Sequence, residues 1–150
     1  MMKRIRSTVL GIAAVCMAVG GAPAVSAAPS DQGDALCEFT YPTPDDTTIG
    51  GSSATFAAPA GPGAATFTML TDAGTETSYE QKFNLIWANL DTGRNGGAEV
   101  VAKVYGPDNV LSIPAVRTEP GRIALVLQAF NHGNDENRSF GDCSAEYTVV

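Results

Sequence analysis

The stretch YEQKFNLIW, residues 79–87, decides the fold class. Four of its five odd-numbered positions carry large apolar side chains: Tyr79, Phe83, Leu85 and Trp87. Glu80, Lys82 and Asn84 lie between them. A period of two is typical of a β-strand with one face in the core and the other in water. We therefore predict a half-buried strand here, with Trp87 in the core rather than on an exposed ligand-binding surface.

The rest of the chain shows the same period of two in short runs. The segments 66–69 and 99–104 alternate in this way, and Gly and Pro clusters separate the runs. Further strands are expected at about 54–57, 110–116 and 123–130, and around the cysteines at 37 and 143. Pro114 has no N–H to donate, which places its strand at a sheet edge. Because no segment has a helical period over ten or more positions, we predict an all-β sandwich of seven or eight strands in two antiparallel sheets.

The first residues have the composition of a signal peptide. Basic residues precede an apolar run at 8–20, and small residues favour cleavage between Ala27 and Ala28. The apolar run is shorter than the roughly 20 residues that a membrane-spanning helix needs, so no stable membrane anchor is expected. The sequence thus predicts a signal peptide at 1–27, a flexible lead at 28–35 and one β-sandwich domain at 36–150. We expect the protein to be secreted and extracellular.

The net charge of the chain argues against two classes of binding partner. All 16 acidic residues lie after position 27, where six basic residues remain, so the expected mature chain has a formal net charge of −10. Nucleic acid and anionic membrane surfaces would repel such a chain. The acidity does not identify a positive partner, because solubility outside the cell explains it equally well.

The cysteines predict one disulfide. Only Cys37 and Cys143 remain after removal of the signal peptide, and in an exported protein an even count indicates pairing. Strand alternation turns both side chains toward the core. A metal pair or two free thiols would be the alternatives, but the chain has a single histidine and no cysteine pair at zinc-site spacing. The sequence gives no indication of a metal site or cofactor.

The stretch WANLDTGRNG, residues 87–96, joins two expected strands and holds the candidate binding residues. Asn95 and Gly96 are typical of a tight hairpin turn with positive φ, which would start the next strand near Ala98. Asp91, Arg94 and Asn95 are polar residues that a rigid hairpin would present to a partner. The alternative is that these side chains serve only the hairpin's own hydrogen bonds.

Two short stretches carry a family resemblance. The segment 87–96 and the turn Pro120-Gly121-Arg122 resemble a class of small secreted actinobacterial proteins with an immunoglobulin-like β-sandwich and no assigned activity. The resemblance implies an immunoglobulin-like antiparallel arrangement for residues 36–150. In size, acidity and architecture the chain is more distantly similar to the secreted apoproteins of enediyne chromophores. One possible disulfide, where that family has two, puts the implied ligand cleft in doubt.

The sequence contains few candidates for catalytic or metal-binding residues. The segment 131–142 is read as one polar loop containing Asp135, Glu136 and Asp142, and oxygen-rich loops can hold calcium, but the spacing does not match a calcium-binding loop. The lone His132 lies in the same segment, with no nucleophile motif anywhere. We therefore predict no catalytic residues and a non-catalytic module that binds an extracellular protein or small ligand. A small hydrolase using acidic residues is the alternative.

Overall fold

The computed structural model describes residues 33–48 and 50–150. The predicted signal peptide, 1–27, and the lead up to residue 32 lie outside the described residues. Regular structure begins with Leu36, whose N–H donates to the carbonyl oxygen of Thr55 at 2.7 Å, and the first strand starts at the next residue. The described chain from that point is strand and short connections throughout.

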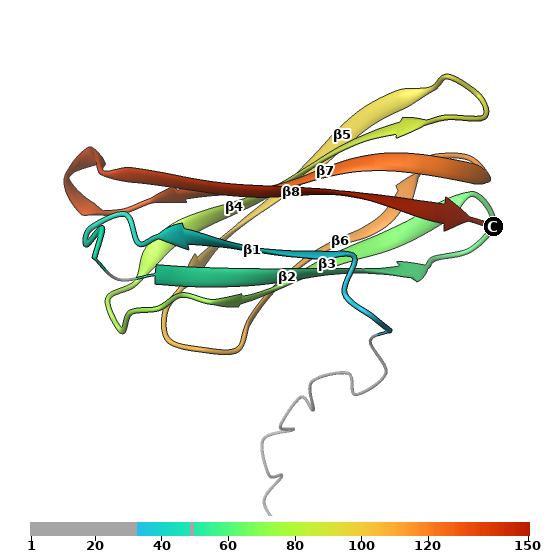
Figure 1. Cartoon of the computed structure of the whole chain (residues 1–150). Coiled ribbons are helices and arrows are strands. Elements are labelled where there is room, and N and C mark those ends of the chain that lie inside the picture. The colour runs from blue at the N-terminus through green and yellow to red at the C-terminus, as the bar shows by residue number, and fades with distance from the viewer. Residues whose placement is uncertain (1–32, 49) are drawn as a thin grey trace, which may run out of the picture. The chain divides into compact units, whose positions relative to one another are not determined.

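Eight antiparallel strands form two sheets of four, which confirms the predicted all-β sandwich (Figure 1). The first sheet has the order β1 (Cys37–Pro42), β2 (Gly50–Pro59), β3 (Ala64–Asp72) and β6 (Asn109–Arg117). The second has the order β5 (Asn95–Val104), β4 (Tyr79–Asn89), β7 (Gly121–His132) and β8 (Arg138–Val149). The chain thus crosses between the sheets after β3, β5 and β6. The pairs β3–β6 and β4–β7 join strands that are distant in the sequence.

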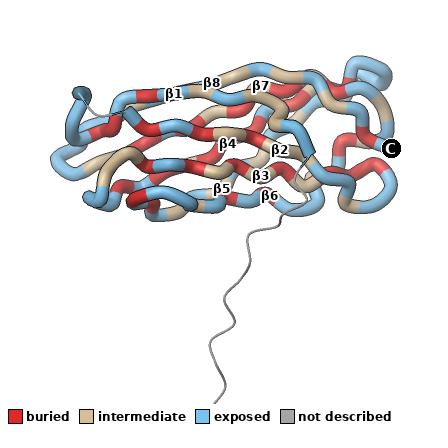
Figure 2. Tube along the Cα trace, turned by 60° about the horizontal axis from the view of Figure 1, so that its bottom comes forward, coloured by how far each residue is buried: buried red, intermediate tan, exposed pale blue. Residues whose placement is uncertain are grey.

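The core lies between the inner faces of the two sheets. Buried and exposed residues alternate along the strands, as Figure 2 shows. The large buried side chains come from both sheets: Phe67, Met69, Phe83, Leu85, Trp87, Leu111, Ile123, Leu125 and Leu127. Each contributes about 1.5–3 kcal/mol by leaving water, which makes this layer the main source of stability. Trp87 is 7 % exposed, so its predicted core position is confirmed.

The two open sides of the sandwich, where the edge strands of the two sheets lie, are built differently. At one side β1 and β8 lie next to each other, and the Sγ atoms of Cys37 and Cys143 are at disulfide-bonding distance, with Cα atoms 6.1 Å apart. Both cysteines pack against the core, as alternation predicted. At the other side lie β5 and β6. β6 is the edge strand that Pro114 predicted.

The predicted turn at Asn95-Gly96 is wrong. Both residues belong to β5, and the β4–β5 loop consists of residues 90–94, in which Gly93 has the positive φ of 77°. The ladder between β4 and β5 continues to the pair Ala88–Asn95, so the strands run past the expected turn. Gly96 instead makes room for the core, because a Cβ there would lie 2.8 Å from Cζ2 of Trp87.

The segment 131–142 is also not a single loop. β7 continues to His132 and β8 begins at Arg138, leaving only residues 133–137 as the connection, with a short 3₁₀ turn at Asn134–Glu136. The strands continue because Phe130 and Phe140 pair across the ladder with ring centroids 5.0 Å apart. Asp142 therefore lies on a strand, away from the loop that holds Asp135 and Glu136.

Candidate functional site

The outer face of the second sheet contains a shallow groove of about 760 Å³. Its apolar floor comes from β4 and β7, and we call it the sheet groove. The floor residues are Ile86, Ala88, Ala124 and Val126. Polar side chains at its margin come from β5 and β8: Asn95, Ser144 and Glu146.

The strand register explains why the sheet is hollowed here. One row across the sheet reads Gly97, Ile86, Val126, Ser144, and the next reads Asn95, Ala88, Ala124, Glu146. Both rows therefore place small side chains around Ile86, which is 49 % exposed. An exposed isoleucine between small neighbours leaves apolar surface that a ligand can cover.

The margin carries one carboxylate. Glu146 Oε2 lies 3.9 Å from Arg122 Nε, and both side chains are more than half exposed. An ion pair this exposed contributes at most about 1 kcal/mol. A ligand can therefore displace the arginine from Glu146 at small cost.

The structure separates the three sequence-predicted binding residues into two groups. Asp91 and Arg94 lie on the β4–β5 loop, whereas Asn95 is the first residue of β5 and lines the sheet groove. Asp91 Oδ2 accepts a hydrogen bond from the N–H of Arg122 at 2.8 Å. Arg94 forms an ion pair with Glu119 in the loop between β6 and β7. Both side chains thus tie the hairpin loop to a neighbouring segment.

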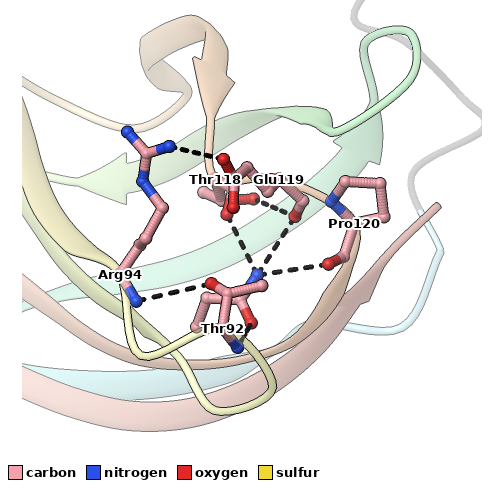
Figure 3. A network of polar contacts seen from close by, with 6 residues as sticks. Thr92, Arg94, Thr118, Glu119 and Pro120 are labelled. Atoms are coloured by element: carbon pink, nitrogen blue, oxygen red, sulfur yellow. Dashed lines mark hydrogen bonds and ion pairs between the residues drawn. The ribbon is translucent and has the colours of Figure 1, made fainter.

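Asn89, which sequence reasoning missed, organises this contact. Its side chain is buried at the end of β4, where Oδ1 accepts the N–H groups of Asp91 and Thr92 at 3.0 Å each. Its Nδ2 donates to the carbonyl oxygen of Thr118 at 3.0 Å, with longer contacts to the next two carbonyls. Figure 3 shows Thr92 and Arg94 beside residues 118–120. Strand alternation places residue 89 on the inner face, and a polar residue there is the signal that was available.

A closed ring of buried hydrogen bonds crosses the core near the opposite end. Gln81 Nε2 donates to the Tyr41 hydroxyl at 2.8 Å, and Thr71 Oγ1 donates to Gln81 Oε1 at 2.8 Å. Ser53 Oγ lies 3.0 Å from Tyr41 and 2.8 Å from Thr71. Each hydroxyl has one hydrogen, so Ser53 must donate to Thr71 and Tyr41 to Ser53. The ring therefore runs in one direction and joins β1, β2, β3 and β4.

The loops at this end hold two neighbouring carboxylates in a hollow of about 240 Å³ that is also lined by Tyr79. Asp45 accepts the backbone and side-chain N–H groups of Asn134 at 3.1 and 3.0 Å. Hydrogen bonds from the Thr48 hydroxyl and N–H hold the pKa of Asp46 below its usual range. Burial raises the pKa of the Tyr79 phenol. A carboxyl with a lowered pKa stays ionised at neutral pH and is therefore a poor general acid there.

The candidate calcium ligands fall on separate elements. Asp135 and Glu136 are exposed on the connection between β7 and β8, whereas Asp142 lies on β8. His132, which was considered as a catalytic residue, is exposed at the end of β7. Across residues 33–48 and 50–150, no three His, Cys, Asp or Glu side chains are grouped so that they could hold a metal ion. The described part of the chain also has no helix of the length and apolarity needed to cross a membrane.

The sheet groove and the adjoining loop thus form a candidate surface on the described part of the chain. Its apolar floor, its polar margin and the neighbouring rigid loop are suited to non-covalent contact with a ligand. Comparison with protein-family models, curated proteins and solved structures found no match for the chain.

Proposed function

We propose that this chain is a secreted, non-catalytic binding protein and that its ligand lies in the sheet groove. The observation that carries the proposal is the apolar floor around Ile86, at a position where small neighbouring side chains hollow the outer face of the sheet. The ligand class that fits is an amphipathic molecule, or an extended segment of an extracellular protein, with an apolar side for Ile86 and Val126. Its polar groups would face Asn95 and Glu146.

The three predicted site residues take different parts in this proposal. Asn95 contacts the ligand directly, because it lines the groove. Asp91 and Arg94 position the loop through Arg122 and Glu119. A loop that is already ordered loses little entropy when a ligand binds beside it.

Export and fold family are part of the same proposal. The basic and apolar pattern at 1–27 supports secretion, and a disulfide-bonded cysteine pair fits an oxidising compartment. Greek-key crossings and the buried Trp87 on β4 support an immunoglobulin-like classification. The disulfide departs from the antibody pattern, since it joins two edge strands and not two strands inside the sheets.

The test is a thermal-shift screen of the mature protein against small apolar ligands, oligosaccharides and divalent metals. A compound that binds the native state raises the melting temperature, by an amount that grows with its concentration. We expect hits among apolar and amphipathic compounds, and we expect Ile86→Lys to abolish them. The substitution places a charge on the floor of the groove without removing core volume, because Ile86 is half exposed.

Val110→Lys is the matched control. Val110 is 52 % exposed on β6 of the other sheet, so it has the same surface character as Ile86 outside the groove. Every compound that stabilises the wild-type protein should also stabilise the Val110→Lys variant. Hits that persist in Ile86→Lys would exclude the groove, and turnover of a substrate that depends on one acidic residue would overturn the non-catalytic assignment.

A further inference from the structure

Three of the four sheet edges in this sandwich are covered or irregular. β1 and β8 face each other and are joined through Cys37 and Cys143. β6 carries Pro114, and Ala115 beside it has a positive φ of 49°. Its ladder with β3 also shifts register between Ala65 and Phe67. Proline and bulges are devices that prevent an edge strand from pairing with another chain.

β5 is the fourth edge. It lies beside β6 at the other side of the sandwich, but it carries neither a proline nor a bulge. It pairs with β4 over ten consecutive residues without a register shift, and among the described residues no strand pairs with its other side. Val101 in its middle is 48 % exposed on the outer face. Inner-face residues Ala98, Val100 and Ala102 are only partly buried. The strand therefore offers free backbone groups together with apolar side chains on both faces.

The charges along β5 are complementary to a second copy of the same strand. In an antiparallel pair with a two-fold axis at Val101, each residue lies opposite the one equally far on the other side of 101. Glu99 of one copy then lies opposite Lys103 of the second copy, and Lys103 opposite its Glu99. Val101 meets Val101. Opposite charges at facing positions stabilise a strand pair, whereas like charges destabilise it.

We propose that two copies of this chain associate edge to edge through β5, centred on Val101, so that the two second sheets become one continuous sheet. The Glu99 side chain is already ordered in the single chain, because Lys82 Nζ lies 3.4 Å from its Oε2. Lys82 in turn lies 5.1 Å above the ring centre of Phe130. Preordered side chains lower the entropic cost of association.

A strand from a different protein is the competing occupant of this edge. A free sheet edge can bind any extended peptide through main-chain hydrogen bonds. A single lysine at an edge usually discourages such pairing. The copy of this same chain overcomes that effect, because it places an acid opposite the lysine twice in one interface.

The test is sedimentation equilibrium of the exported protein over concentrations of about 1 µM to 1 mM, since one strand pair forms a small and therefore weak interface. We expect a dimer that forms with rising concentration and dissociates as salt screens the two ion pairs. Glu99→Lys and Lys103→Glu should each weaken dimerisation about tenfold or more, because each creates two facing like-charge pairs.

Charge exchange gives the decisive comparison. A mixture of Glu99→Lys and Lys103→Glu should form a heterodimer, and the double variant should regain the dimer, because both restore opposite charges. These restored complexes also show that the single variants fold. Glu136→Lys is the control, since it breaks a comparable exposed ion pair with Arg138 far from β5, and it should dimerise as the wild type does. A monomer at every concentration, or a dimer insensitive to the charge exchange, would overturn the proposal.

Discussion

Gln81 occupies a core position that strand alternation reserves for apolar side chains. It is fully buried, yet its amide bonds to Tyr41, Thr71 and Asn131, which come from three different strands. In a medium of low polarity such a network is stable only when every member has a partner. The residue therefore fixes how the two sheets face each other as well as contributing to stability.

Replacing Gln81 with leucine should cost about 3 kcal/mol or more of unfolding free energy, because buried groups on three partners lose their hydrogen bonds. Urea denaturation measures the loss. Asn84→Leu is the matched control: Asn84 donates to Gln128 at 2.7 Å on the outer face, where water replaces the lost bond. It should cost less than about 1 kcal/mol. Equal losses in the two variants would contradict the role given to the ring.

Because of Tyr79, we expect the unfolding free energy of the protein to fall at alkaline pH. Its phenol is 4 % exposed and donates to the carbonyl oxygen of Ala73 at 3.2 Å, and burial raises its pKa. Below a pH of about 10 the phenol is neutral in both states, so its contribution is complete. Above that pH the unfolded chain ionises and the folded chain does not, so the unfolding free energy should fall as pH rises.

Urea midpoints measured between about pH 8 and pH 11 test this dependence. Tyr79→Phe should flatten the alkaline slope, since phenylalanine cannot ionise. Tyr105→Phe, at a tyrosine that is 60 % exposed, should leave the slope in place. A slope unchanged by Tyr79→Phe would assign the alkaline loss to other groups.

At the scale of the element, the sequence predicted strands better than the connections between them. The alternation correctly predicted the inner face of residues 79–87 and the inward direction of both cysteines, because a period of two is a local property of the sequence. The turn near Asn95 was placed too late. What decides that loop is Asn89, whose partners lie about 30 residues away at 118–120. A local pattern carries no information about such a partner.

β1 provides a test at the same scale. Within its sheet β1 pairs only with β2, and the bond between Cys37 and Cys143 joins it covalently to β8. Reduction should lower the unfolding free energy by up to about 4.7 kcal/mol, the chain-entropy value for a loop of about 100 residues. Hydrogen exchange should then show amides of β1 losing protection before those of β7, which is paired on both sides. Uniform loss across the sheets would contradict this local attachment.

At the scale of the whole molecule, strand alternation and turn spacing were enough to predict two antiparallel layers and seven or eight strands. The order of strands was not predictable, because the pairing of β3 with β6 and of β4 with β7 depends on crossings between the layers. The sheet groove was missed for the same reason. Its small residues, among them Ala88 and Ala124, become neighbours only once the register of three strands is known.

The attachment of the first strand to the last also has a mechanical consequence. Cys37 and Cys143 are separated by 106 positions, and nearly the whole sandwich lies within the covalent loop that they close. A pulling force applied at the two ends of the chain passes from one cysteine directly to the other. The core strands then bear almost no load, and within β1 and β8 only residues 144–149 lie outside the loop and can be drawn out while the bond is intact. The disulfide thus makes the sandwich a nearly inextensible link between the two ends of its fold.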